Sequence, residues 1–324
     1  LHPRVRRQRQ MCIRDRFRGC IRGCRFCQAG YVYRPVREKS ADAILDKSKT
    51  LVETSGHEEV SLTSLSTADY REFRKLAEGL LEQFKDEKVN IALPSLRIDA
   101  FSLDLMQKVQ GVRKSSLTFA PEAGTQRLRD VINKGITEEE ILRGSSLAFE
   151  GGWDRVKLYF MVGLPTETDE DVKGIAKLAS DIVDKFYELP KEKRNRGVSV
   201  TVSSSCFVPK AFTPFQWSAQ NTCDEFLRKQ YLLKDSNERK QVKVNYHEPT
   251  VSSIEGILAR GDRKVAKLIV QAWENGAKFD GWTESFKYDA WLKALEQTGL
   301  SREFYANRER SYDEILPWDH ISIG

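Results

Sequence analysis

The sequence predicts an α/β fold, with βα units built around a largely parallel sheet and a mostly helical C-terminal extension. From about residue 39, amphipathic helix-like stretches alternate with short apolar runs. These runs carry the branched and aromatic residues of strands covered on both faces, as at 156–163. After about residue 240 the alternation gives way to helical, aromatic-rich sequence. Together these observations favour a barrel or a doubly wound sheet.

The predicted elements follow one another along the chain. The strand-like runs are 58–65, 89–94, 115–120, 154–162 and 197–208. The helix-like runs are 41–55, 70–85, 101–111, 125–134, 137–150, 168–188 and 222–235. The charged segment at 191–197 predicts an exposed loop between the fifth and sixth units. One further strand-like run, 243–249, opens the extension.

Composition excludes several classes of protein. The chain has 324 residues, 40% of them hydrophobic, as in a globular protein. Its apolar runs fall short of the roughly 20 residues that cross a bilayer, so we expect no membrane role. The first residues contain no apolar signal core, and the expected location is therefore cytoplasmic.

The net charge of +6 is unevenly placed. Residues 1–16 hold six arginines and one aspartate, which contribute +5 and leave only +1 for the remainder. This segment looks like translated adapter or cloning sequence, so we expect it to be non-native and outside the fold. Nucleic-acid binding is therefore not supported by the body of the chain. A local basic patch that fits an anionic ligand surrounds the cysteines, formed by Arg18, Arg22, Arg25, Arg34 and Arg37.

Cys20, Cys24 and Cys27 form a C-x3-C-x2-C spacing in a loop rich in glycine and arginine. Three thiolates on a short loop can converge on one inorganic centre. Three close cysteines cannot all pair as disulfides, and structural zinc needs a fourth Cys or His nearby. In a [4Fe-4S] cluster, three cysteines leave one iron open to an exogenous ligand. Zinc and a chance cluster of buried thiols remain the alternatives.

This motif resembles the signature of the radical S-adenosylmethionine (radical SAM) superfamily, in which an aromatic residue, here Phe26, precedes the third cysteine. The resemblance covers nearly all of 17–324. It is closest to uncharacterised bacterial proteins whose longer members carry an upstream cobalamin (B12)-binding domain. The matching segments are GCIRGCRFCQAGYVYRPVRE, LPSLRIDAF, TFAPEAGTQRLRDVINKG, KLYFMVGLPTETDED, FVPKAFTPFQW, ARGDRK, KFDGW and LPWDHI.

The resemblance implies a partial TIM-type (β/α)6 barrel over 17–240 and a C-terminal extension over 241–324, with both ends truncated. It implies an enzyme that reductively cleaves S-adenosylmethionine at a [4Fe-4S] cluster, forming a 5′-deoxyadenosyl radical that acts on an unknown substrate. A flavodoxin- or ferredoxin-type protein is the implied reductant. We expect cobalamin to take part only through an upstream domain that these residues do not contain.

The resemblance also places cosubstrate-binding residues at the strand ends, where α/β folds bind ligands. Ser64 and Ser66 follow the second strand and would bond the methionyl amino group. Alternatively Ser66, Thr67 or Asp69 caps the next helix. Arg97, after the third strand, would pair with a carboxylate of the cosubstrate, although a surface ion pair explains it too.

Later strand ends supply further candidates. Glu122 would reach the ribose or the methionyl amino group, and Arg127 the methionyl carboxylate, unless Arg127 is simply solvated on its helix. Gly163 would permit close approach of the adenine, next to a helix capped by Thr168. Val208 would help to form an apolar wall near the adenine, although an ordinary core position explains it equally well.

The extension carries a set of polar and aromatic residues on the expected substrate side: His247, Glu248, Arg260, Asp262, Arg263, Asp280, Trp282, Glu284, Trp318, Asp319 and His320. A lone histidine, however, is more often structural. Cys206 and Cys223 are expected to be free thiols.

Two rival functions remain open at this point. One is RNA or protein modification of the methylthiotransferase kind. The other is a non-catalytic iron-sulfur protein for electron transfer or sensing, which would not need a cosubstrate pocket. The chain lacks the phosphate-loop, HExxH and GxSxG motifs of nucleotide hydrolysis, zinc proteolysis and serine esterases.

Overall fold

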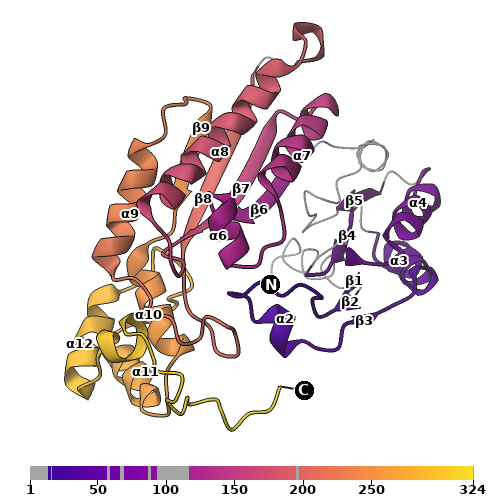
Figure 1. The fold of residues 1–324 in the computed structure, drawn as a ribbon. Helices are drawn as coiled ribbons and strands as arrows, with labels where there is room; N and C mark the ends of the chain where they lie inside the picture. The colour runs from indigo at the N-terminus through magenta and orange to yellow at the C-terminus, as the bar shows by residue number, and fades with distance from the viewer. Residues whose placement is uncertain are drawn as a thin grey trace.

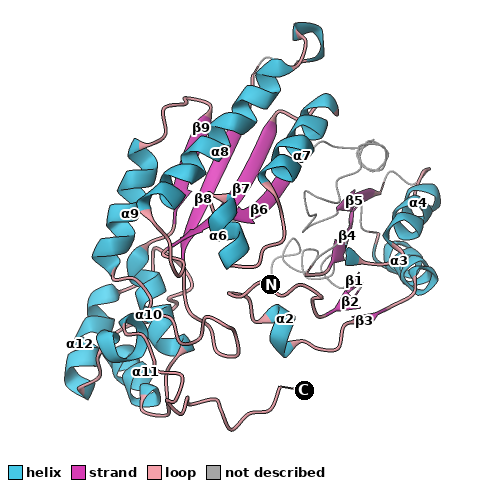
Figure 2. Cartoon of the chain, in the orientation of Figure 1, coloured by secondary structure: helices cyan, strands magenta, loops and turns pink. Residues whose placement is uncertain are grey.

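The computed structural model describes residues 14–15, 17–56, 59–65, 69–86, 89–92, 117–194 and 197–323. The predicted α/β class is confirmed: most of the described strands form parallel sheets with helices packed against them, and β2 and β3 form a short antiparallel pair (Figures 1 and 2). The strands are β1 (Arg14–Asp15), β2 (Phe17–Arg18), β3 (Arg37–Glu38), β4 (Glu59–Thr63), β5 (Asn90–Ala92), β6 (Leu117–Glu122), β7 (Arg155–Val162), β8 (Ser199–Cys206) and β9 (Val242–Tyr246). The α-helices are α2 (Ala29–Val32), α3 (Ala41–Ser55), α4 (Phe73–Gln83), α6 (Gln126–Val131), α7 (Glu138–Glu150), α8 (Asp169–Glu188), α9 (Cys223–Asp235), α10 (Pro249–Ala259), α11 (Val265–Glu274) and α12 (Tyr288–Thr298).

The larger sheet has the order β6-β7-β8-β9, with every pairing parallel. Its core contains the buried residues Leu158, Val200 and Val202 from the strands, and Ile175 and Ile182 from α8. Side chains on β7 alternate between buried and partly exposed, and Tyr159 is 40% exposed. The prediction that these strands are covered on both faces is therefore wrong for β7. One face of β7 packs into the helix-covered core, whereas alternate residues on the other face reach solvent.

A second parallel sheet has the order β1-β4-β5. Its buried face packs against α3 and α4, where Ile44 and Leu76 meet Leu62. The two residues of β1 come from the segment expected to lie outside the fold, yet they pair with Leu62 and Thr63 of β4. The predicted helix at 101–111 lies outside the described residues.

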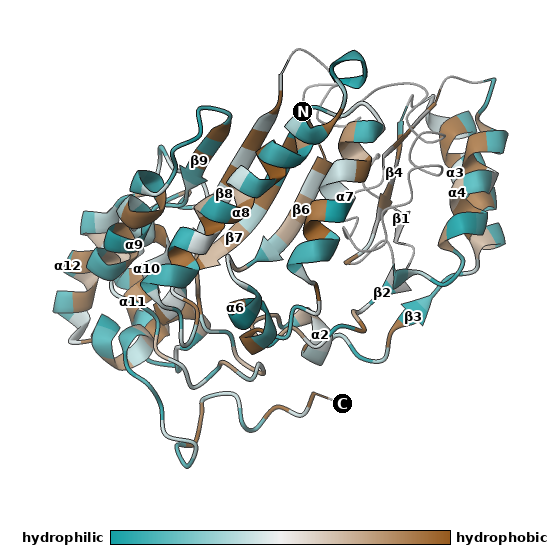
Figure 3. Ribbon diagram, turned by 45° about the horizontal axis from the view of Figure 1, so that its top comes forward, coloured by the Kyte–Doolittle hydropathy of each residue, from teal (hydrophilic) through white to brown (hydrophobic). Residues whose placement is uncertain are grey.

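Local signals determine where these helices begin and end. Ser40 caps α3 by accepting a hydrogen bond from the Ala43 amide, and Gly56 ends the helix in the left-handed conformation. Thr137 forms a capping box with Glu140 at the start of α7. Figure 3 shows hydrophobic and hydrophilic segments alternating along α3 and α8, as expected for helices that bury one face.

The C-terminal part is mostly helical, as predicted, although β9 first adds a strand to the larger sheet beside β8. Helices α10, α11 and α12 form a separate core around Ile257, Leu268 and Trp291. A short π-helical turn follows at Glu303–Asn307. None of the helices in the described part of the chain is long and apolar enough to span a membrane.

Candidate functional site

The cysteine loop folds back tightly on the short helix α2. Cys27 donates its amide to the carbonyl of Cys24 at 3.1 Å, which forms a turn between the second and third cysteines. Gly30 is buried, and a Cβ at this position would lie 2.1 Å from the carbonyl oxygen of Arg22. Only glycine therefore lets the backbone of α2 come this close to the loop.

The three cysteines are half-buried and form no disulfide within the described part of the chain. Cys20 accepts a hydrogen bond from the Arg22 amide at 3.4 Å and lines a cavity of about 610 Å³. Burial and the neighbouring Cys24 raise the pKa of the Tyr31 hydroxyl, whereas Arg34 and Arg25 oppose this shift. The donor set suits an iron-sulfur cluster, because three thiols and no fourth cysteine come from one short loop.

Among the residues that the structure describes, no group of three His, Cys, Asp or Glu side chains could hold a single metal ion. A [4Fe-4S] cluster makes a different demand, because each cysteine binds a separate iron.

The cysteine loop rests on a turn formed by residues 131–134, which we call the docking turn. The Arg25 amide donates to the carbonyl of Ile132 at 2.9 Å, and its guanidinium donates to the carbonyl of Val131 at 2.6 Å. The Asn133 amide group donates to the carbonyl of Gly23 at 2.8 Å. These bonds attach the loop to the segment that follows α6, beside the carboxyl ends of β6–β9 (Figure 1).

Glu122, Lys134 and Phe26 connect the cysteine motif to a strand end. Glu122 closes β6 with φ at 69°, where the register with β7 shifts. Its carboxylate lies 3.2 Å from the Lys134 ammonium, and the two side chains are 17% and 14% exposed. Lys134 also lies 5.9 Å from the centre of the Phe26 ring. Burial raises the pKa of Glu122, and the charge of Lys134 opposes that shift.

Phe26 belongs to an apolar cluster that joins several strand ends. It packs against a buried group consisting of Ala123, Leu128, Ile132, Leu164, Phe207 and Phe215. Phe207 and the buried Val208 follow directly after β8. The aromatic residue of the motif is thus part of the core beneath the loop.

The other side of the loop is bound to the smaller sheet. The Arg22 guanidinium pairs with Asp69, with 2.9 Å between Nε and Oδ2. The predicted capping role of Asp69 is wrong, because α4 begins at Phe73, its N-cap is Glu72 and no side chain caps it. Ser64 lies half-buried just beyond β4. Two predicted site residues, Ser66 and Arg97, lie outside the described residues, as does Thr67.

Arg127 forms an ion pair with the buried Asp171 and donates to the carbonyl of Thr166 at 2.8 Å. Its side chain is still 49% exposed, so it keeps room for a second anion. Burial tends to raise the pKa of Asp171, but hydrogen bonds from Thr125, Arg127 and Thr168 outweigh it and lower the pKa overall. The prediction that Thr168 caps α8 is confirmed by a capping box with Asp171.

A buried ion pair that the sequence did not reveal supports the turn at Gly163. Gly163 has φ at 83°, and a Cβ here would lie 2.4 Å from the Phe226 ring. Glu167 accepts the Gly163 amide at 2.7 Å and pairs with Lys229 at 2.8 Å. The side chains of Lys229 and Glu167 are only 7% and 1% exposed. Burial raises the pKa of Glu167, and Lys229 acts against this rise.

Several predicted substrate-side residues of the extension serve the fold. Arg260 is fully buried and donates to the carbonyls of Ser218 and Ala306 at 2.8 and 3.1 Å. Asp280 accepts a hydrogen bond from the Trp291 ring at 3.0 Å. Trp318 is buried and donates to Gln216 at 2.7 Å. These contacts are structural.

Fold and site together define an α/β protein with a three-cysteine loop at the strand ends of a parallel sheet. The sequence profile of the Radical SAM superfamily matches residues 16–179. The chain belongs to the radical SAM superfamily, whose members use a [4Fe-4S] cluster and S-adenosylmethionine. The resemblance predicted from the cysteine motif is thereby confirmed.

Two relatives come from the archaeon Methanocaldococcus jannaschii. An uncharacterised protein is 33% identical over 252 residues, covering 78% of this chain and 52% of its own length. A protein provisionally named a methylthiotransferase is 24% identical over 162 residues, covering 48% of this chain and 35% of its own length. The chain thus spans about half or less of the curated relatives it matches.

Solved structures with a similar outline include two radical enzymes. The cobalamin-dependent S-adenosylmethionine radical enzyme OxsB, with aqua-cobalamin and S-adenosylmethionine bound, has a TM-score of 0.49 at 11% identity, covering 90% of this chain and 45% of that one. The methyltransferase TsrM from Kitasatospora setae, with cobalamin and a [4Fe-4S] cluster bound, has a TM-score of 0.48 at 15% identity, covering 63% and 35%. Identities this low give no information about substrate.

Proposed function

We propose that the chain reductively cleaves S-adenosylmethionine at a [4Fe-4S] cluster held by Cys20, Cys24 and Cys27, and that the resulting radical acts on a substrate still to be identified. The observation that carries this proposal is the attachment of the cysteine loop to the strand ends. The loop is bound on one side by the docking turn and on the other by the Arg22–Asp69 pair. Membership of the superfamily supports it independently.

A cluster held by Cys20, Cys24 and Cys27 would supply one-electron reduction to S-adenosylmethionine bound beside it. The protein side chains bind the cosubstrate and exclude water. Glu122, held by Lys134, would accept hydrogen bonds from the ribose or the methionyl amino group. Arg127 would bind the methionyl carboxylate through its exposed edge.

The remaining predicted contacts complete the cosubstrate pocket. Gly163 is proposed for the approach of the adenine on sequence grounds alone, because the Phe226 ring already fills the space where a side chain would project. Val208 and the neighbouring Phe207 would cover the adenine on its apolar side. Ser64, Ser66 and Arg97 are proposed for the methionyl end on sequence grounds alone.

A methylthiotransferase-like modification of RNA or protein is the second candidate. It is favoured by the relative from Methanocaldococcus jannaschii that bears this provisional name. Both candidates require a reductant of the flavodoxin or ferredoxin type. Cobalamin assistance would be an addition to the first candidate, supplied by a separate domain.

The test is anaerobic reconstitution with iron and sulfide, followed by reduction with dithionite and assay of 5′-deoxyadenosine. We expect about four irons per chain, as a [4Fe-4S] cluster requires, and deoxyadenosine from the wild-type chain. Cys24→Ala should abolish both. Cys223→Ala is the matched control, because Cys223 is a half-buried free thiol outside the loop, and it should keep both.

The outcomes separate the competing functions. An intact cluster that yields no deoxyadenosine, despite bound S-adenosylmethionine, would favour a non-catalytic electron-transfer or sensor protein. Equal loss of iron in Cys24→Ala and Cys223→Ala would refute the assignment of the cluster to the loop.

A further inference from the structure

A cavity of about 650 Å³ lies beside the connection between α10 and α11. It is lined by Gly261, Asp262, Arg263, Lys264, Pro317 and His320. Two separate parts of the extension therefore form its walls, the α10–α11 connection and the segment near residue 320. The lining residues include an arginine, a lysine and a histidine but only one carboxylate, so positive charge is in excess.

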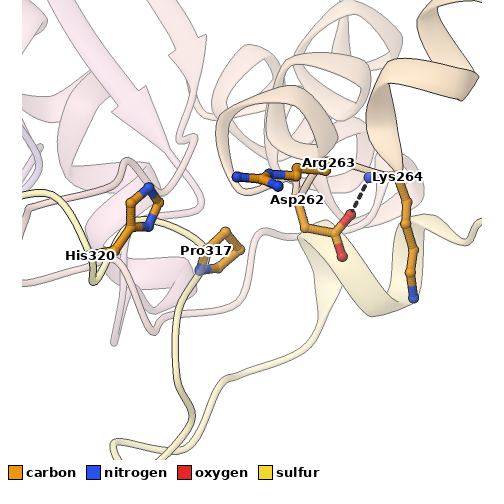
Figure 4. A pocket seen from close by; sticks show the side chains of 6 residues that line it. Asp262, Arg263, Lys264, Pro317 and His320 are labelled. Atoms are coloured by element: carbon orange, nitrogen blue, oxygen red, sulfur yellow. Dashed lines mark hydrogen bonds between the residues drawn. The ribbon is translucent and has the colours of Figure 1, made fainter.

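The one carboxylate of the lining is already engaged by the protein. Asp262 accepts the Tyr305 hydroxyl at 3.1 Å and the Lys264 amide at 2.8 Å. Within the described part of the chain, no carboxylate lies within 4.0 Å of the Arg263 guanidinium. Figure 4 shows Arg263 extending toward the side where Pro317 and His320 lie, whereas the Lys264 side chain extends away from them. Arg263 thus presents an uncompensated fork of N–H donors to the cavity.

Buried arginines behind this wall add to the positive potential. Arg260 precedes Gly261 and is fully buried, and Arg310 is 4% exposed. Both donate to carbonyl groups. Burial and the neighbouring arginines lower the pKa of Arg260 to about 10, so it stays charged at neutral pH. In a poorly solvated interior such charges act over longer distances than in water.

The cavity is connected to the cysteine loop by a short series of contacts. The Gln28 side chain, next to Cys27, donates to the carbonyl of Ala211 at 3.1 Å. Ala211 belongs to a buried cluster with Leu316 and Trp318, the two neighbours of the cavity-lining Pro317. The cavity wall at Pro317 therefore packs on the loop that follows β8. This loop lies at the same end of the sheet as the cysteines.

We propose that this cavity binds an oxyanion group of the substrate, a carboxylate or a phosphate, through Arg263 with His320 opposite. The role of the anion as part of the substrate rests on the proposed radical function, but binding of the anion itself does not. A planar guanidinium can donate two parallel hydrogen bonds to either group. Anchored there, the remainder of the substrate would extend toward the cysteine loop.

Binding is tested on the full chain without iron or S-adenosylmethionine, so its outcome does not depend on radical chemistry. Inorganic phosphate is titrated and followed by its ³¹P line width, and acetate by saturation transfer to its methyl protons. Arg263→Ala should lower the affinity for the bound ion about tenfold or more, as expected when a charge-assisted hydrogen-bonded pair is lost. Lys267→Ala also removes one positive charge, from an exposed position on the neighbouring α11 that lies outside the cavity, and should change affinity less than about twofold.

Loss of binding in Arg263→Ala alone supports the site, and the ion that binds, phosphate or acetate, identifies the group. Equal weakening in the two variants would show a general charge effect and overturn the proposal, as would no binding of either ion to the wild type. Arg263 is exposed, so the variant should fold, and a thermal melt checks this. Deoxyadenosine formed by a chain that binds neither ion would leave the radical function standing and reject only this site.

Discussion

Lys134 performs two tasks at the residue scale. Its ammonium neutralises the half-buried Glu122 and lies near the Phe26 ring of the cysteine motif. The docking turn to which it belongs also holds the loop through Asn133. Burial disfavours the charged form of a carboxylate. A nearby cation is therefore needed to keep Glu122 ionised. Lys134 is therefore a positioning residue as well as a counter-ion.

Replacing Lys134 by methionine should weaken binding of S-adenosylmethionine, and more so at lower pH. Burial already raises the pKa of Glu122, and removing the lysine removes the opposing effect. The carboxylate would then take up a proton at a higher pH than in the wild type and lose its acceptor strength. Calorimetry between pH 6 and 9 measures the affinity for S-adenosylmethionine. The difference in affinity between Lys134→Met and the wild type should become smaller as pH rises.

Lys157→Met is the matched control for that experiment. Lys157 lies 4.6 Å from the centre of the Tyr159 ring, in a similar cation–π contact. It should leave the affinity nearly unchanged at every pH. A pH-independent loss in Lys134→Met would mean that the lysine acts on packing alone.

Residues whose role depends on neighbours in sequence were predictable. A threonine where a helix is expected to begin predicts a cap at Thr168, and the structure confirms it with a capping box to Asp171, three residues on. Asp69 looked like a cap by the same reasoning, but it pairs with Arg22, 47 positions earlier. No local pattern signals a partner at that separation, and the long-range pair prevailed over the local one.

At the scale of elements, the Lys229–Glu167 pair holds α9 against the turn between β7 and α8. Both side chains are nearly inaccessible to solvent, so each depends on the other for neutralisation. The turn gave a sequence signal through its glycine and proline, but Lys229 lies 62 residues away from Glu167 and gave none. The helix and strand bounds of this region follow the predicted runs closely, because caps and hydrophobic periodicity are local.

Lys229→Met should lower the free energy of unfolding by about 3–5 kcal/mol, the usual effect of leaving a buried charge unpaired. The folded-state pKa of Glu167, already raised by burial, would rise further. A raised carboxyl pKa means that the folded state holds its proton more tightly than the unfolded state. The variant should therefore be relatively stable in acid and lose stability as pH rises toward that folded-state pKa.

Urea unfolding at several pH values measures this effect. Lys173→Met is the control, since its partner Glu170 is exposed and the pair contributes little. Adding Glu167→Gln to Lys229→Met should remove the extra pH dependence. An unfolding free energy equal to that of the control would show that the buried pair is not needed.

At the scale of the whole molecule, the cysteine loop contacts both sheets. Arg22 reaches Asp69 beside the smaller sheet, while Arg25 and Asn133 connect the loop with the segment after β6 and α6. The sequence predicted the order of βα units but not this bridging, because it depends on how separate sheets are placed. It also did not predict that β9 extends the larger sheet, because the strand-like run at 243–249 was assigned to the C-terminal extension.

Loading with iron and sulfide should slow amide hydrogen exchange in two places at once. A bound cluster would hold the three thiolates of the loop on one rigid centre, so residues 20–32 should become protected. The docking turn should follow, because it is hydrogen-bonded to that loop. Helix α3 serves as the internal reference, since its buried side packs on β4 away from the loop. Unchanged exchange in 20–32 on loading would contradict binding of the cluster by this loop.

The docking turn has a consequence for how the sequence can diverge. Two of its acceptors are main-chain carbonyls, those of Val131 and Ile132, and every amino acid provides such a group. Side chains at these two positions can therefore vary among descendants as long as they still suit the core. Asn133 donates through its side chain, so its replacement would cost a bond that no neighbour can supply. Substitutions should thus be tolerated unevenly over these four consecutive residues. A position that contacts the loop through its backbone should accept more side chains than one that contacts it through its side chain.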